Sequence, residues 1–414
     1  MTHTKTLQQM VRTEIGSFPP DWPIRRLDQI AGGVSVGLVI NPSTYFSERG
    51  TVPMLLGSQV TPNKIDHGAA KRITSQSNTK IPASILRAGD LITVRVGDPG
   101  TTAVIPDELD GCNCASMMII RRAPSFNSAW LSHLLNSPVG SRQVANVQYG
   151  TAQKQFNIGD AVGFLFPVPP KSEQDAISKA LSDTDTLIDS LEQMLTKKRQ
   201  IKQGAMQELL TGKRRLPGFE QPWISRAFAD VASFGRERVN PSALNSPPLC
   251  VELEHLEPGT GRLSGDAFES QQAATKSVFQ RGDVLFGKLR AYLRKYWLAD
   301  FDGVCSTEIW VLRARGELGS NAYLFYTIQR DDFISVASTA YGTHMPRSDW
   351  KIVGEFDLAL PSDTTEQVAI AEVLSNMDSE IAALESRLSK ARALKQAMAQ
   401  ALLTGRIRLV EPTA

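Results

Sequence analysis

The amino-acid sequence predicts an α+β protein in which two globular segments of mixed α/β structure are separated by two long helices. The first observation is an internal repeat, because Glu173-Gln174 returns 193 residues later as Glu366-Gln367. Leu209-Leu210-Thr211-Gly212 returns at the same offset as Leu402-Leu403-Thr404-Gly405. The second observation is that the stretch before each Leu-Leu-Thr-Gly has helical hydrophobic spacing. The chain is therefore a tandem duplication, and each copy is a globular segment followed by a helix.

The apolar residues of the repeated stretches follow the spacing of a coiled coil. In residues 173–210 and in the second copy they recur in steps of three, four and seven, which is the pattern of a heptad seam. The seam residues are Leu181, Ile188, Leu191 and Leu195 in the first copy and Leu374, Met377, Ile381, Leu384 and Leu388 in the second. A second stripe recurs every seven residues at Leu187, Met194 and Ile201. Helices of about 38 residues, ~57 Å long, are roughly three times the average length. An antiparallel coiled coil between the copies, with a pseudo-two-fold relation, is therefore favoured over ordinary core packing.

Sequence signals at the ends of each copy set the domain boundaries. Residues 172–175 and 364–367 resemble capping boxes at helix starts. Gly212 and Gly405 suit the left-handed position that follows a helix end. We therefore expect two globular segments and two helical segments, at 1–165, 166–215, 216–360 and 361–414 in chain order.

Composition places the chain among soluble globular proteins without deciding its function. The 414 residues are 42% hydrophobic and 21% charged, and the formal net charge of +2 neither requires nor excludes nucleic acid as a partner. No apolar run approaches the ~18 residues of a membrane span, and the N-terminal residues lack the apolar core of a secretory signal. The four cysteines are too few for a disulfide framework. These features predict a cytoplasmic protein with no membrane association.

No complete catalytic motif is found in the sequence. Residues 282–289 nearly match a phosphate-binding loop, but Leu289 stands where a Ser or Thr would bind magnesium. Residues 41–44 and 246–249 each resemble only a fragment of an amino-methyltransferase motif. Cys112 and Cys114 could bind zinc with His133, but no second ligand pair follows, so buried free thiols are favoured. We therefore expect a chain that is no enzyme and holds no metal.

Candidate nucleic-acid contacts gather in two kinds of segment. A basic and aromatic cluster at 288–297 would present cations to phosphates and rings to bases or sugars, although a solvated strand face is an equally favoured interpretation. The repeated Tyr-Gly-Thr segment predicts a glycine-containing loop that ends in a cation in each copy. The first copy lacks the Lys-Leu-Arg cluster and has Arg95 nearby instead. The candidates are Arg95, Gly150, Thr151 and Lys154 in the first copy and Lys288, Arg290, Tyr292, Arg294, Lys295, Thr343, His344 and Arg347 in the second.

Together these motifs resemble the specificity subunit of Type I restriction-modification systems. The motifs that carry the resemblance are the proline-rich entry at 166–170, its second copy Leu360-Pro361, the two Leu-Leu-Thr-Gly helix ends, residues 282–290 and the Gly-Thr loops. The resemblance covers essentially the whole chain. It implies two target recognition domains that each read one half of a split double-stranded DNA sequence, and helices that fix the gap between the halves.

The resemblance also implies partners. Two methyltransferase subunits would carry S-adenosylmethionine, and endonuclease/translocase subunits would use ATP and Mg, so this chain itself would need no cofactor. Because the two globular segments have diverged, the expected target is asymmetric. The alternative is a coiled-coil scaffolding protein that does not bind DNA. A nuclease or methyltransferase that acts alone is disfavoured by the missing motifs.

Overall fold

The computed structural model describes residues 10–265, 268–269, 274–339 and 346–410. The chain divides into two compact units, residues 1–191 with 387–414 and residues 192–386. The first unit is thus built from both ends of the chain, and each unit contains part of both long helices. Within the described ranges, no helix has both the length and the apolar character needed to cross a lipid bilayer.

Two sheets form the centre of the first unit. The antiparallel sheet has the order β10-β9-β12-β4, with bounds Thr102–Val104, Leu91–Thr93, Met118–Ile120 and Val34–Val36. The mixed sheet has the order β11-β5-β8, with bounds Asn113–Cys114, Val52–Leu55 and Arg72–Ile73. Further strands pair as β1 with β2, β3 with β13 and β6 with β7, at Val11–Thr13, Gly16–Phe18, Ile24–Arg26, Leu165–Pro167, Val60–Thr61 and Lys64–Ile65. Every residue of β9 and β12 is buried, as expected for continuous apolar runs at the middle of a sheet.

Short helices cover the sheets of the first unit. The α-helices are α1 to α5, at Leu27–Ile30, Ser75–Thr79, Ser128–Leu135, Pro138–Val147 and Ile158–Ala161. The 3₁₀ turns are η1 to η4, at Pro42–Tyr45, Gly57–Gln59, Pro82–Ser84 and Asp107–Leu109. Asn127 caps α3 by accepting from the Trp130 N–H. Trp130 and Leu131 then pack in one core with Ile177 and Leu181 of the first long helix.

The second unit repeats this arrangement. Its antiparallel sheet has the order β15-β23-β20-β21, with bounds Ala232–Phe234, Ile309–Ala314, Val284–Gly287 and Tyr296–Leu298. Its mixed sheet has the order β16-β19-β22-β17-β18, with bounds Arg238–Val239, Lys276–Phe279, Gly303–Cys305, Leu249–Val251 and Phe268–Glu269. Strands β14 and β24 pair at Trp223–Ala227 and Asp357–Pro361. The helices and 3₁₀ turns are α7 to α10 and η5 to η7, at Phe228–Val231, Asn321–Thr327, Asp331–Ala337, Trp350–Gly354, Pro241–Ala243, Leu253–His255 and Ala291–Leu293.

The antiparallel sheets of the two units correspond strand by strand, and the mixed sheets, which have three and five strands, correspond in part. The order β4-β12-β9-β10 matches β15-β23-β20-β21, and in each mixed sheet one parallel pair, β5 with β11 or β17 with β22, has an antiparallel strand beside it. In each unit an early strand pairs with the strand that leads into the long helix: β3 pairs with β13, and β14 pairs with β24. The predicted fold class, with its tandem repeat, is therefore confirmed.

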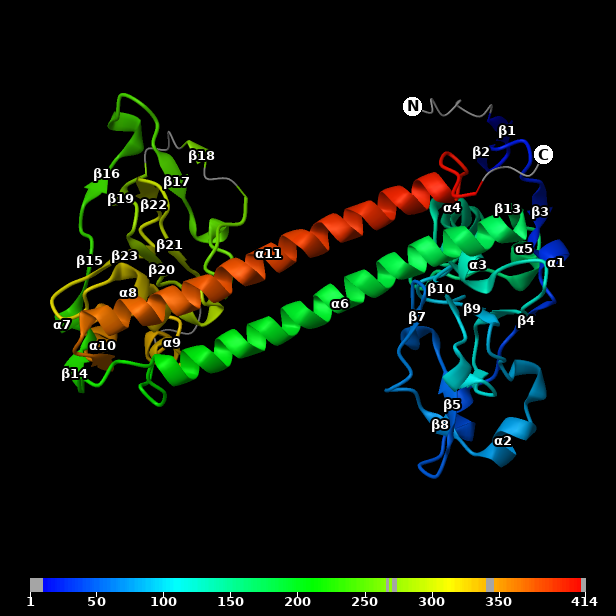
Figure 1. Cartoon of the computed structure of the whole chain (residues 1–414), viewed down its shortest axis with the longest axis horizontal. Helices are drawn as coiled ribbons and strands as arrows, with labels where there is room; N and C mark the ends of the chain where they lie inside the picture. Colours follow the sequence, from blue (N-terminus) through cyan, green and yellow to red (C-terminus); the bar gives the residue numbers. More distant parts are fainter. Residues whose placement is uncertain (1–9, 266–267, 270–273, 340–345, 411–414) are drawn as a thin grey trace. The chain divides into compact units, whose positions relative to one another are not determined.

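Helices α6 (Lys171–Leu209) and α11 (Thr364–Leu402) are each 39 residues long. They run antiparallel to each other in each unit (Figure 1). In the first unit Lys395 lies 2.5 Å from Asp185, and in the second unit Lys202 lies 2.5 Å from Asp378. Residue numbers on α11 fall as those on α6 rise, as an antiparallel alignment requires. Of the predicted seam residues, Met377 and Leu384 are half-buried, and the others are buried: Leu181, Ile188, Leu191, Leu195, Leu374, Ile381 and Leu388.

Two expectations about these helices need correction. The second stripe is not buried, because Leu187, Met194 and Ile201 are 47%, 42% and 47% exposed. The predicted capping boxes are also wrong in register. Helix α6 begins at Lys171, before the predicted cap, and α11 is capped by Asp363, whose carboxylate accepts from the Thr365 N–H at 2.8 Å. The left-handed glycines are confirmed, since Gly212 and Gly405 have φ of 70° and 69°.

The glutamates of the predicted capping boxes have another role, which explains the error. Glu173 and Glu366 are fully buried near the helix starts. Arg408 donates to both carboxylate oxygens of Glu173, and Trp22 donates its indole N–H to the same group at 3.2 Å. In the second unit Arg215 donates to both oxygens of Glu366, at 2.5 and 2.7 Å. In each unit the start of one long helix is thus tied to an arginine that follows the end of the other.

We predict that Arg408→Ala destabilises the first unit by about 3 kcal/mol, because it leaves Glu173 buried without its charged partner. Urea unfolding of the full chain measures this effect. Arg406→Ala is the matched control, since Arg406 is exposed two residues earlier on the same segment. Equal stability of the two variants would contradict the role given to Arg408.

His133 of α3 makes the first unit sensitive to acid. Burial lowers the pKa of His133 from 6.5 to about 4, Asp185 opposes this shift, and Lys395 adds to it. Because the unfolded chain binds this proton more tightly, the contribution to stability is full above about pH 6.5 and falls as the pH drops toward about 4.

We predict that wild-type protein loses about 2 kcal/mol more stability than His133→Gln between about pH 7.5 and about pH 5. Glutamine takes up no proton in this range, so the difference between the two urea-unfolding series isolates the histidine. Parallel pH profiles for the two proteins would show that folding does not lower the pKa of His133.

Candidate nucleic-acid interface

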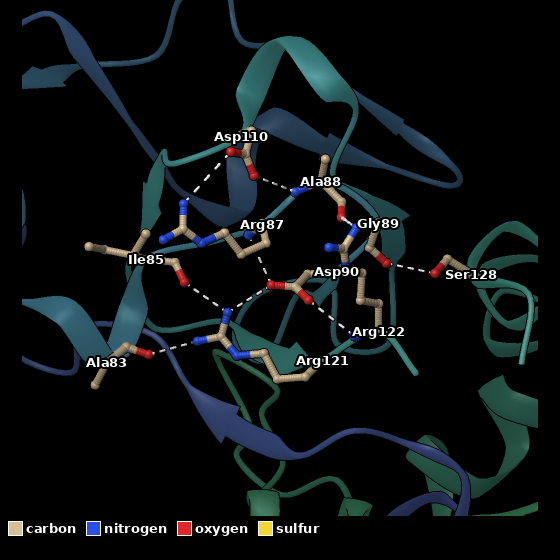
Figure 2. Close-up of polar contacts among 10 residues, drawn as sticks. All are labelled: Ala83, Ile85, Arg87, Ala88, Gly89, Asp90, Asp110, Arg121, Arg122 and Ser128. Carbon is tan, nitrogen blue, oxygen red and sulfur yellow. Dashed lines mark hydrogen bonds and ion pairs between the residues drawn. The ribbon is translucent and has the colours of Figure 1, made fainter. Parts of the chain in front are cut away.

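A glycine-aspartate turn precedes the central strand of the antiparallel sheet in both units. In the first unit Gly89 has a φ of 85°, a conformation that glycine adopts without strain. The carboxylate of Asp90, only 2% exposed, accepts hydrogen bonds from the Arg87 and Arg122 backbone N–H groups and from the Arg121 guanidinium at 2.7 Å. Figure 2 shows Arg121 reaching Asp90 and two backbone carbonyls together. The turn is therefore a fixed structural support for β9.

The same turn is built in the second unit, where the sequence resembled a phosphate-binding loop. Gly282 has a φ of 89°, and Asp283 accepts from the Gln280 N–H at 2.8 Å. Arg313 donates two hydrogen bonds of 2.7 Å to the Asp283 carboxylate. Residues 284–287 then form the buried strand β20. These residues are a supported strand rather than a loop around a phosphate, as their weak motif match indicated.

Each supported strand leads into a hairpin loop that contacts the exit of the Gly-Thr loop. We name residues 94–101, between β9 and β10, hairpin loop 1, and residues 288–295, between β20 and β21, hairpin loop 2. In the first unit the Gly97 N–H donates to the Lys154 carbonyl at 3.0 Å, and the Phe156 N–H donates to the Arg95 carbonyl at 3.3 Å.

The equivalent backbone hydrogen bonds are formed in the second unit. The Arg290 N–H donates to the Pro346 carbonyl at 2.8 Å, and the Ser348 N–H donates to the Lys288 carbonyl at 2.8 Å. The structure therefore brings together, in each unit, the two kinds of segment that the sequence indicated separately. This adjacency was not predicted, and the sequence carries no signal for it.

The candidates of the first unit lie around this junction. Gly150 has a φ of 95°, and Gly150, Thr151 and Lys154 are exposed. Arg95 is half-buried and its Nε lies 3.4 Å from the Ser116 carbonyl. The junction thus offers one exposed cation, Lys154, beside a glycine-containing turn.

The candidates of the second unit differ in whether their side chains have partners among the described residues. Arg290 and Tyr292 are exposed, and Lys288 is half-buried. The others have partners in the chain, since Arg294 contacts Asp331 at 2.5 Å, Lys295 donates to the Leu253 carbonyl at 2.8 Å and Arg347 contacts Glu308 at 2.8 Å. Thr343 and His344 lie outside the described residues.

The remaining motifs have structural explanations. Asn41 and Asn240 each cap a 3₁₀ turn by accepting from the Ser43 or Ser242 N–H, so residues 41–44 are a repeated turn that the sequence analysis missed. Burial raises the pKa of the Cys112 thiol to about 12, and all four cysteines are buried thiols that form no disulfide bond. Among the described residues, no cluster of three or more His, Cys, Asp or Glu side chains is arranged to hold a metal ion.

Known proteins share this architecture of two repeated mixed domains and two long helices. Residues 265–391 match the model of the Type I restriction modification DNA specificity domain. The Type I restriction enzyme EcoDI specificity subunit of Escherichia coli is 26% identical over 198 residues, which is 46% of this chain and 42% of that protein. A Methanocaldococcus jannaschii protein, assigned as the type I restriction enzyme MjaX specificity subunit, is 22% identical over 422 residues, or 96% of each chain.

A solved structure agrees with this fold. The S subunit of the Type I restriction-modification system from M. genitalium matches with a TM-score of 0.59 over 92% of this chain and 96% of that one, at 13% identity. The resemblance predicted from the sequence is thus confirmed, and the chain is similar to specificity subunits of Type I restriction-modification systems. Specificity subunits are the non-catalytic DNA-recognition components of these systems, which agrees with the absence of a complete catalytic motif in the sequence.

We predict that Asp90→Asn destabilises the first unit by about 3 kcal/mol, because it removes the charge from a buried ion pair and leaves the Arg121 guanidinium poorly compensated. Asp110→Asn is the matched control, since that side chain is 52% exposed, its ion pair is with an exposed arginine, and an asparagine oxygen can still accept from the Ala88 N–H. The control is expected within about 0.5 kcal/mol of wild type in urea unfolding. A loss of similar size in both variants would show that the turn does not depend on the buried charge.

Proposed function

We propose that this chain is the DNA-specificity subunit of a Type I restriction-modification complex and binds double-stranded DNA without catalysing a reaction. One observation carries the proposal. In both units of one chain, the hairpin loop makes the same backbone hydrogen bonds to the segment that follows the Gly-Thr motif, but its side chains differ. A supported loop with exposed polar and cationic groups is suited to contact phosphates and base edges.

The duplication supports a split target. Hairpin loop 1 carries Arg95 and Asp98, whereas hairpin loop 2 carries two lysines and two arginines. Two DNA-contacting loops that differ so strongly in charge are expected to prefer different bases. The target would therefore have two unlike halves. Helices α6 and α11 each contribute to both units, and we propose that they set the gap between the half-sites.

We further propose that the chain assembles with two methyltransferase subunits and with endonuclease/translocase subunits. S-adenosylmethionine, ATP and Mg would then be bound by those partners rather than by this chain. The similarity to specificity subunits supports this part of the proposal. The competing function is a coiled-coil scaffold that does not touch DNA.

Binding of the full chain to duplex DNA, measured at rising salt, separates the two functions. If four or more phosphates are contacted, affinity is expected to fall on the order of 100-fold or more between about 50 mM and about 200 mM salt. Lys154→Gln is expected to reduce the slope of the logarithmic plot by about 1, because Lys154 is exposed at the proposed interface.

Lys179→Gln is the matched control, because Lys179 is exposed on α6 and pairs with Asp183 at 2.7 Å. This variant is expected to keep the wild-type slope. Salt-independent binding, or no duplex binding at all, would favour the scaffold.

A further inference from the structure

The two hairpin loops have the same frame but differ at one left-handed position. Gly97 and Arg290 make the corresponding hydrogen bond to the exit of the Gly-Thr loop, and both have a positive φ, of 98° and 53°. Glycine adopts this conformation freely, whereas a side chain with a Cβ is strained there. The second unit therefore places an arginine where the first unit has the residue best suited to the backbone.

Contacts at both ends of the turn stabilise the strained backbone of hairpin loop 2. Arg294 is also left-handed, with a φ of 53°, and lies at the other end of the 3₁₀ turn Ala291–Leu293. Its guanidinium donates to the Gln329 carbonyl at 3.2 Å and to Asp331. Strained positions of this kind persist only when the surroundings fix them, and they are concentrated at functional sites.

The side chain of Arg290 has no partner among the residues that the structure describes. No side-chain hydrogen bond or ion pair forms from Arg290 to any described residue, and Arg290 is exposed. The neighbouring Tyr292 ring is 53% exposed. A guanidinium that is exposed and contacts no described side chain, on a loop whose backbone is fixed, is suited to bind a ligand.

We propose that Arg290 reads a guanine in the half-site bound by the second unit. This inference rests on the proposed function. Arginine donates two hydrogen bonds to the O6 and N7 acceptors of guanine in the major groove, and this pairing requires a fixed approach. The fixed backbone of hairpin loop 2 would position the Arg290 guanidinium for this pairing. The Tyr292 ring beside it can pack on a base or sugar.

The decisive variant is Arg290→Gly, which gives hairpin loop 2 the residue found at Gly97. Because glycine relieves the left-handed strain, the variant is expected to melt at or above the wild-type temperature. Loss of folding would then not explain a loss of recognition. Arg281→Ala is the matched control, since Arg281 is an exposed arginine at the opposite end of strand β20.

Enrichment of a random-sequence duplex library by the full chain tests the proposal. Wild-type protein is expected to enrich a split motif, and Arg290→Gly is expected to lose the preference for guanine at one position of one half by about 5- to 150-fold. The other half-motif stays unchanged, and Arg281→Ala keeps the whole motif.

An unchanged motif for Arg290→Gly, or equal weakening at every position, would overturn the inference while the proposed function stands. If wild-type protein binds duplex DNA but enriches no motif, both are overturned.

Discussion

The buried pairs Glu173–Arg408 and Glu366–Arg215 are the contacts on which the rest of the structure depends. Each joins the first turn of one long helix to a segment just beyond the end of the other. A buried carboxylate is tolerated only with a charged, hydrogen-bonded partner, so neither helix start is complete without the other copy of the repeat. This constraint explains why the first unit needs both ends of the chain and why α6 and α11 are antiparallel in both units.

The two globular segments share a supporting frame and differ in the hairpin loops that the frame supports. The glycine-aspartate turn, the buried aspartate-arginine pair and the backbone hydrogen bonds to the segment that follows the Gly-Thr motif are present in both units. The hairpin loops that this frame supports differ in charge and in backbone strain. Under the proposed function, this fixed frame with variable loops would let one fold serve two different DNA half-sites, since loops tolerate substitution without loss of the core.

Sequence reasoning predicted the features that depend on local periodicity and on the repeat. The helices, their glycine ends and the paired architecture followed from heptad spacing and from the 193-residue offset. It could not decide which apolar stripe of α6 is buried, because Leu187, Met194 and Ile201 have the same spacing as a seam and only packing distinguishes them. The capping error has a similar origin, since Glu173 is recruited by Arg408, which is 235 residues away.

For the candidate site, too, the sequence predicted the local features but not the contacts between distant segments. The sequence identified the Gly-Thr segments and the basic cluster, but not that they meet, because the contact joins segments far apart in the chain. Nor could it separate Arg290 from Arg294 and Lys295, whose partners lie 37 and 42 residues away. The repeated Asn-Pro-Ser turn escaped detection because its copies, Asn41 and Asn240, are 199 rather than 193 residues apart.

The central claim is that one chain carries two unlike DNA readers joined by a duplicated pair of helices. Genome-wide mapping of adenine methylation in cells with and without this gene tests it most directly. The account predicts that deletion abolishes methylation at one split motif whose two halves differ in sequence. Unchanged methylation, or loss of a motif that is continuous or has two identical halves, would contradict it.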